Sequence, residues 1–448
     1  MWTGRSSSVS QLPIYLLPRI AAIIAFVAAF VAAFVSAGIA SAAEPDPFDG
    51  KWLYADVEHY ASLGNHQFGT LGDVATTSWL AGDLQAAGLT TSFQSFELAK
   101  QYALIDAGAE VMGQRMSVLP FWWPPEQAAT FELNARIAAD GTANATGMIV
   151  WMRMPFDGGA YISERQRTIV ATAAKRSPSA IILSIDSPSG DEYAYNVAQQ
   201  DNAWPVPVFI VGAKYAERLE KARSTGARIE LRTKGRYFHD VTGHNVVARL
   251  NRGASKTVVI STPTTGWFTC ACERGPGIAI FLALARAAAQ SKHKVNYVFV
   301  ATTGHEIGHG GMERFMHDGA PKPADTLAWI HLGSSLACYE WQLEGERWTT
   351  NHSVDPRRTL FFTSMLEQSV SKAFRDVPVI MTPTADRSPA GELRDVHAAG
   401  YRQYVGMAAG HRFFHTPNDD VSRTGPEALE PIARAFEKMM DEIINANE

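Results

Sequence analysis

The sequence predicts an α/β protein with a mostly parallel sheet covered by helices on both faces, plus a smaller inserted α/β module. Short, nearly continuous apolar runs, such as residues 256–262 and 294–303, are typical of strands buried on both sides. Helical patterns rich in Ala and Leu, such as residues 275–290, separate these runs, and this alternation favours parallel pairing. A chain of 448 residues with 46% hydrophobic residues is long enough to bury more than one core.

The first 43 residues have the pattern of a secretory signal peptide. Arg5 and Arg19 precede or border an uncharged apolar run at 21–43, and the small residues at 40–43 provide a cleavage site. We therefore expect an exported protein, periplasmic or extracellular. The apolar run is also long enough to span a bilayer, so the alternative is an uncleaved N-terminal membrane anchor.

The charge of the chain argues against nucleic acid as a partner. The full sequence has a formal net charge of -5, and removing residues 1–43 takes away two of the 40 Lys and Arg residues and none of the 45 Asp and Glu residues. A chain with this excess of negative charge repels a phosphate backbone.

Residues 44–139 are predicted to form the first part of the main domain. Two helical patterns, at 51–64 and 74–89, are followed by a strand pattern at 90–98.

Residues 140–238 are predicted to form the inserted module, because short apolar runs alternate there with helical patterns. We expect strands at 147–151, 179–184 and 206–211, and helices at 164–177 and 213–226.

Residues 239–448 are predicted to complete the main domain. We expect strands at 244–250, 256–262, 294–303 and 326–333, and helices at 275–290, 358–374 and 426–446.

Four segments with chemically active side chains follow the strands of this last region. In an open parallel sheet, ligands bind beyond the carboxyl ends of the strands, so these segments are expected to meet. They are TPTTGWFTCACERG (262–275), GHEIGHGG (304–311), GSSLACYE (333–340) and GHRFFHTPNDD (410–420).

With these segments in order, the chain resembles the M28 family of zinc-dependent aminopeptidases and carboxypeptidases, in the variety with an inserted protease-associated (PA) domain. The segment FGTLGDVATTSWLAGDLQAAGL (68–89) is similar to the family's G-T-x-G segment and its helix. GHNVVARLNRGASKTVVIST (243–262) is similar to the strands that lead to the first zinc ligand, and residues 140–238 match the PA insert in position. The resemblance implies a zinc exopeptidase fold, zinc as cofactor, and a peptide or small amide as substrate.

Two of the family's ligand positions are lost in this sequence. The family's H-x-D motif falls on Pro263–Thr265, and its second Asp falls on Gly333, two residues after His331. The family holds two zinc ions, so these losses imply at most one ion here.

The remaining positions imply a rebuilt site. The bridging Asp falls on Glu273, the ligand Glu on Glu306, and the final His on His415, and these three residues are the expected metal ligands. The family's general base, a Glu, falls on His305, a side chain suited to accept a proton near neutral pH. Asp419 stands where the family has a supporting acid. Cys272, His331 and Asp419 are possible additional site residues.

The segment HEIGH (305–309) also matches the H-E-x-x-H pattern of helical zinc proteases. Four glycines crowd this stretch, at 304, 308, 310 and 311, and glycine is a poor helix former. The third ligand expected of a metzincin is absent, because Phe315 stands at its position. We therefore expect His309 to be a loop or supporting residue.

The three cysteines leave alternatives open. Export favours a disulfide from Cys338 to either Cys270 or Cys272. Otherwise Cys272 is a soft zinc ligand, or a nucleophile activated by His305.

The sequence therefore predicts an exported metal-dependent hydrolase of peptide or amide bonds with an atypical, single-metal site. Two alternatives remain. One is a catalytically inactive, peptidase-like binding module, which the lost ligands favour. The other is a non-peptidase enzyme that acts on a small molecule with the rebuilt Cys and His site.

Overall fold

The fold was analysed in a computed structural model that describes residues 46–198, 204–385 and 387–447. The predicted signal peptide, residues 1–43, lies outside these residues. Pro47–Glu448 forms one compact unit. Within the described part of the chain, no helix combines the length and the apolar character needed to cross a bilayer.

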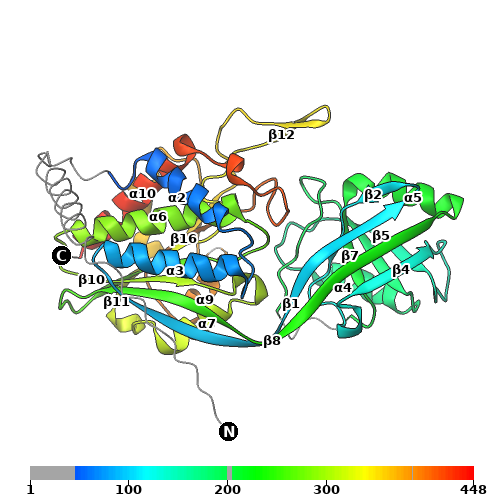
Figure 1. The fold of residues 1–448 in the computed structure, drawn as a ribbon. Helices are drawn as coiled ribbons and strands as arrows, with labels where there is room; N and C mark the ends of the chain where they lie inside the picture. The colour runs from blue at the N-terminus through cyan, green and yellow to red at the C-terminus, as the bar shows by residue number, and fades with distance from the viewer. Residues whose placement is uncertain (1–45, 199–203, 386, 448) are drawn as a thin grey trace, which may run out of the picture. The chain divides into compact units, whose positions relative to one another are not determined.

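A ten-stranded sheet forms the centre of this unit (Figure 1). Its four middle strands pair in parallel, whereas the pairs that involve β8, β1, β2 and β4 are antiparallel, so the sheet as a whole is mixed. The strand order is β15 (Ile380–Pro383), β14 (Thr359–Phe362), β16 (Tyr404–Ala408), β11 (Thr326–Leu332), β9 (Thr257–Pro263), β10 (Asn296–Thr302), β8 (Arg228–Leu250), β1 (Thr90–Val111) and β2 (Gln114–Met116), with β4 (Phe131–Arg136) also paired to β8.

Helices cover both faces of this sheet, which confirms the predicted α/β class (Figure 1). One face carries α2 (Gly50–Ser62), α3 (Leu71–Ala86), α6 (Ala271–Gln290), α8 (Glu367–Ala373) and α10 (Pro426–Asn445), and the other carries α7 (Gly310–Asp318) and α9 (Leu393–Ala398). Side chains of a strand point alternately to the two faces. Accordingly, Val258 and Ile260 of β9 belong to the core under α6, and Val259 packs in the core with Met312 of α7.

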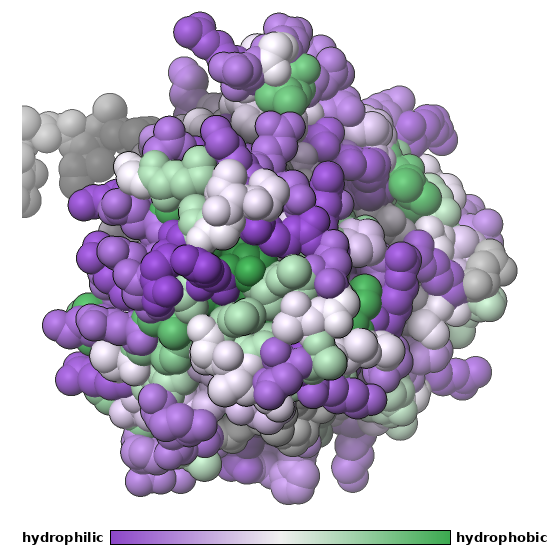
Figure 2. Space-filling view, turned by 90° about the vertical axis from the view of Figure 1, so that its right-hand side faces the viewer, coloured by the Kyte–Doolittle hydropathy of each residue, from purple (hydrophilic) through white to green (hydrophobic). Residues whose placement is uncertain are grey.

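A separate four-stranded sheet forms a module at the far ends of β1 and β8 (Figure 1). Its order is β3 (Leu119–Pro120), β7 (Val208–Gly212), β6 (Ala180–Ile185) and β5 (Ile149–Met154), with α4 (Glu164–Ala174) and α5 (Ala216–Thr225). All three strands and both helices predicted for residues 140–238 are present, and β3 adds a strand from before residue 140. The face of the molecule on this side is mainly hydrophilic, with apolar groups visible in a central hollow (Figure 2).

The predicted helix at 358–374 is wrong in its first half. The run TLFF at 359–362 forms the strand β14, which pairs with both β16 and β15. Three of its four residues are buried, so its aromatic and β-branched side chains fit a pleated sheet better than an amphipathic helix. The helical part is confined to η7 (Ser364–Leu366) and α8.

Short elements complete the described chain. They are the hairpin β12 (Gln342–Glu344) and β13 (Arg347–Thr349), and the 3-10 turns η2 (Glu126–Ala128), η4 (Ala213–Tyr215), η5 (His305–Ile307), η6 (Pro323–Asp325) and η8 (Val421–Arg423).

Candidate active site

The four strand-end segments meet at one edge of the sheet, as parallel pairing requires. β9, β10, β11 and β16 lie side by side, and their carboxyl ends lead into the segments at 262–275, 304–311, 333–340 and 410–420. Residues from all four segments line a single pocket of about 610 Å³: Arg274, His305, His309, Gly333, Ser334, Gly410 and His411.

The HEIGH segment is not a continuous helix. His305–Ile307 forms the 3-10 turn η5, and Gly308 then takes a left-handed conformation with a φ of 109°. His309 is also left-handed, with a φ of 65°, and α7 begins only at Gly310. The two histidines therefore do not share one face of an α-helix, so the zinc-protease helix is excluded.

His305 is held by a buried carboxylate that the sequence did not single out. Its Nδ1 lies 3.1 Å from Oε1 of Glu392, and Oε2 of Glu392 accepts a hydrogen bond from Thr302 at 2.7 Å. The backbone N–H of His305 donates to Oγ1 of Thr265 at 3.0 Å. Burial, reinforced by the positive charge of Arg274, holds the pKa of His305 well below its usual value. The ring is therefore neutral and faces the pocket.

His309 is held in the same way. Its Nδ1 lies 3.0 Å from Oδ2 of Asp395, and its ring stacks on that of His305 with the centroids 4.7 Å apart. Asp395 follows Glu392 by three residues, so one turn at α9 positions both imidazoles. An acid at the start of a helix is usually explained by the helix dipole. For this reason, no sequence pattern marked Glu392 or Asp395 as a site residue.

Glu273 and His415 come together, as their predicted roles require. Oε1 of Glu273 lies 3.4 Å from Nε2 of His415 and 2.7 Å from Nη2 of Arg274. All three side chains are buried. Burial alone would raise the pKa of Glu273, but Arg274 and His415 lower it to about 2. Arg274 was not among the residues predicted for the site.

Glu306 lies apart from this pair. Its Oε1 accepts a hydrogen bond from the backbone N–H of Phe68 at 2.6 Å. Burial raises the pKa of Glu306 to about 7. Glu273, Glu306 and His415 do not form a group in which all donor atoms lie within 4.8 Å of one another.

The two lost ligand positions offer no metal-binding side chain. Thr265 uses its carbonyl oxygen to accept from Nε of Arg274 at 3.0 Å. A Cβ atom at Gly333 would lie 2.4 Å from the carbonyl oxygen of Met407, so the backbone leaves no room for an aspartate there. Nearby, Nδ1 of His331 lies 2.8 Å from Oγ of Ser261, and burial lowers the pKa of His331 to about 4.

Cys272 and Cys338 form a disulfide, which settles the cysteine pairing. Together with His411 they are the one trio of potential ligands, in the described part of the chain, whose donor atoms lie within 4.8 Å of one another. Sulfurs bonded to each other are not thiolates, so in the oxidised protein neither acts as a metal ligand or nucleophile. Cys270 is free and buried, and burial raises the pKa of its thiol far above the usual value.

Asp419 supports the site through the backbone. Its two carboxylate oxygens accept from the N–H groups of Cys272 and Glu273, at 2.9 and 3.1 Å. These groups belong to the first turn of α6, where a negative charge is favoured by the helix dipole. Asp419 thereby fixes the turn that carries Glu273 and Arg274.

The donor set fits a single cation at one point and does not fit two zinc ions. Nδ1 of His415 lies 2.7 Å from the carbonyl oxygen of Ala194, which only accepts, so Nδ1 carries the proton. In the neutral ring, Nε2 then presents a lone pair to Oε1 of Glu273 and has no hydrogen-bond partner among the described residues, whereas Oε1 is ion-paired with Arg274. A cation placed between these two atoms, which lie 3.4 Å apart, would contact both of them.

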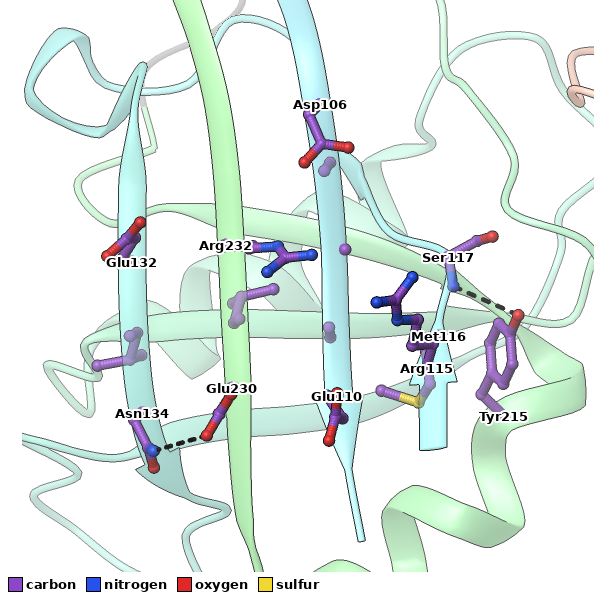
Figure 3. A pocket seen from close by; sticks show the side chains of 15 residues that line it. Asp106, Glu110, Arg115, Met116, Ser117, Glu132, Asn134, Tyr215, Glu230 and Arg232 are labelled. Atoms are coloured by element: carbon purple, nitrogen blue, oxygen red, sulfur yellow. Dashed lines mark hydrogen bonds between the residues drawn. The ribbon is translucent and has the colours of Figure 1, made fainter. Parts of the chain in front are cut away.

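A larger pocket, of about 740 Å³, lies elsewhere and has a different character. Figure 3 shows acidic and basic side chains intermixed along β1, β8, β4 and β2, including Glu110, Glu132, Glu230, Arg115 and Arg232. No His or Cys lines it among the described residues. Size alone would favour this pocket, but the groups that can hold and transfer protons converge at the strand ends.

Solved structures of aminopeptidases share this fold. A zinc aminopeptidase from Bacillus subtilis is 16% identical, with a TM-score of 0.66, and the match covers 89% of this chain and 96% of that chain. An aminopeptidase from Aneurinibacillus sp. strain AM-1 is 14% identical, with a TM-score of 0.61 and coverage of 88% and 93%. A peptidase M28 precursor from Shewanella amazonensis is 18% identical, with a TM-score of 0.65 and coverage of 86% and 91%.

These likenesses confirm the predicted fold, which is that of the M28 zinc aminopeptidases over most of the chain. No protein-family model and no curated protein matches the sequence.

Proposed function

We propose that the chain is an exported hydrolase of peptide or amide bonds that works with a single metal ion. The observation that carries this proposal is the approach of Nε2 of His415, which has no hydrogen-bond partner among the described residues, to within 3.4 Å of Oε1 of Glu273, a buried carboxylate oxygen that also faces Arg274. The fold shared with zinc aminopeptidases supports the reaction class. The disulfide between Cys272 and Cys338 supports export, because disulfides persist in oxidising compartments.

Glu273 and His415 would hold the ion, whereas Glu306, the third ligand predicted from the sequence, lies apart from this pair. A zinc ion there would lower the pKa of a bound water and polarise the carbonyl group of the substrate. The carbonyl of Ala194 fixes the ring of His415, as outer hydrogen bonds do for metal-binding histidines.

His305 would accept the proton from the attacking water. A carboxylate accepts hydrogen bonds, so the contact with Glu392 places the ring proton on Nδ1 and leaves Nε2 as the acceptor. The depressed pKa of His305 keeps this acceptor unprotonated at neutral pH. Glu392 acts as a positioning residue, because it fixes the tautomer and orientation of the ring.

The test is a turnover screen of the zinc-loaded protein on N-acyl amino acids, short peptides and aminoacyl amides. His305→Ala is expected to lower kcat by about 100-fold or more while leaving metal content unchanged, since general bases contribute about that much. His317→Ala is the matched control, because the side chain of His317 is 78% exposed. Absence of turnover on every substrate, or full activity of His305→Ala, would contradict the proposal.

A second candidate function is a binding module without catalysis, and Arg274 is the observation that favours it. Its guanidinium already provides a positive charge 2.7 Å from Oε1 of Glu273. In this alternative, the charge of Arg274 neutralises Glu273 without a metal ion. The binding module predicts ligand binding with neither bound metal nor turnover.

A further inference from the structure

We infer that the pocket at the strand ends recognises the carboxylate of its ligand and does not accept a free α-ammonium group. This specifies the substrate class as N-acyl amino acids or the carboxyl ends of short peptides. The binding preference stands on the pocket itself, whereas its use in hydrolysis rests on the proposed function.

The inference depends on the positive charge of the residues that line the pocket. Four arginines line the pocket, and no Asp or Glu does so among the described residues: the arginines are Arg274, Arg357, Arg387 and Arg394. Arg357 is already paired with Asp355. Arg387 and Arg394 are exposed and have no ion pair to a carboxylate in the described part of the chain. Within the described residues, no carboxylate neutralises these two charges.

Three carboxylates next to the pocket are paired with residues of its wall. Glu273 pairs with Arg274, Glu392 with His305, and Asp395 with His309. None of the three lines the pocket. A ligand with a positively charged amino group would meet guanidinium groups there and no carboxylate.

Arg274 adds a buried donor to the wall. It is 1% exposed and lines the pocket, and its Nη1 has no hydrogen-bond partner among the described residues. Leaving a buried charged donor unsatisfied is costly, so an anionic ligand that accepts from Nη1 gains a charge-assisted bond.

Aromatic side chains supply the apolar part of the pocket. Phe156, Tyr161, Tyr193, Phe361 and Phe414 line it. The guanidinium of Arg387 lies 5.8 Å from the ring centre of Phe361, so charge and aromatic surface adjoin. This combination suits a carboxylate attached to an apolar group.

Calorimetry with three matched probes tests the inference without any turnover. The probes are 4-phenylbutyrate, its neutral amide 4-phenylbutanamide, and 4-phenylbutylamine. We expect the carboxylate to bind at least about tenfold more tightly than the amide, the gain typical of one charge-assisted hydrogen bond, and the amine to bind most weakly.

Variants show whether the named arginines are responsible. Arg387→Gln and Arg394→Gln together are expected to reduce the preference for the carboxylate over the amide, with Arg274 supplying what remains of it. Both substituted positions are exposed, so folding is preserved. Arg375→Gln is the control, because Arg375 is exposed and does not line the pocket.

Equal binding of the three probes, a preference for the amine, or an unchanged preference in the double variant would overturn the inference. Carboxylate preference without any turnover of N-acyl amino acids would leave the inference standing and count against the hydrolase. Turnover combined with a preference for the amine would contradict the carboxylate preference and leave the proposed hydrolase function standing.

Discussion

Arg274 is the residue that most clearly separates this site from a two-zinc centre. A guanidinium that is 1% exposed needs a carboxylate partner, and Glu273 provides it at 2.7 Å. A metal ion at Glu273 and His415 would share that carboxylate with Arg274. The positive charge of Arg274 therefore opposes the binding of a second cation at this carboxylate.

Individual residues of the site could be predicted only at positions that match a motif of the M28 family. Glu273 and His415 were predicted as two of three metal ligands, and they lie 3.4 Å apart. Arg274 and Glu392 were not predicted, because their importance comes from contacts with residues that are distant in sequence, such as His305 for Glu392. Local patterns contain no signal for such contacts.

Glu306 gives a pH-dependent stability that can be measured on the metal-free protein. Burial raises its pKa from 4.5 to about 7, so the folded chain keeps a proton that the unfolded chain releases. The stabilisation is complete below pH 4.5 and is lost as pH rises through 7. Glu306→Gln keeps the acceptor for the N–H of Phe68 and cannot ionise. We expect this variant to be more stable than the wild type at pH 8, by up to about 3 kcal/mol, and not at pH 5.

Urea denaturation of both proteins at the two pH values measures this difference. Asp73, whose pKa burial raises to about 6, is present in both proteins and cancels in the comparison. A stability difference that is the same at pH 5 and pH 8 would show that Glu306 is ionised in the folded chain.

At the scale of elements, the first turn of α6 is the part of the site under the tightest constraint. The disulfide joins Cys272 of this turn to Cys338, 66 residues away, in the segment that follows β11. A disulfide that closes a loop of this length stabilises a fold by about 4 kcal/mol, chiefly through the unfolded state. We expect reduction to lower the free energy of unfolding by about that amount.

Unfolding with and without reductant measures this effect, and thiol labelling of the denatured exported protein counts the free cysteines. One thiol per chain, that of Cys270, is expected. Cys270→Ala should respond to reductant as the wild type does, whereas Cys272→Ala/Cys338→Ala should not respond. Three thiols per chain would contradict the disulfide and would count against the proposed export to an oxidising compartment.

Elements with a regular spacing of apolar residues were predicted from the sequence. Elements that depend on pairing with strands distant in sequence were not. The helix at 426–446 is present as α10, nearly to the residue. The run at 359–362 was assigned to a helix, but it lies between β15 and β16, where an extended chain gains hydrogen bonds on both sides. A four-residue apolar run does not reveal which neighbours it will have.

For the whole molecule, the parallel centre of the sheet explains why the site could be located from sequence. Strands in parallel end at the same edge, so segments separated by more than 100 residues converge there. The module then completes the site: the N–H of Val197 donates to the carbonyl of Glu306 at 3.0 Å, and the carbonyl of Ala194 holds His415. The module was predicted from the sequence, but no sequence pattern indicated that it contacts Glu306 and His415.

Native mass spectrometry of the purified protein after zinc loading tests the central claim most directly. We predict one zinc ion per chain in the wild type, and loss of that ion in Glu273→Gln and in His415→Ala, with His317→Ala unchanged. Less than about a tenth of an equivalent of zinc in the wild type, or full retention of the ion by both ligand variants, would contradict the account.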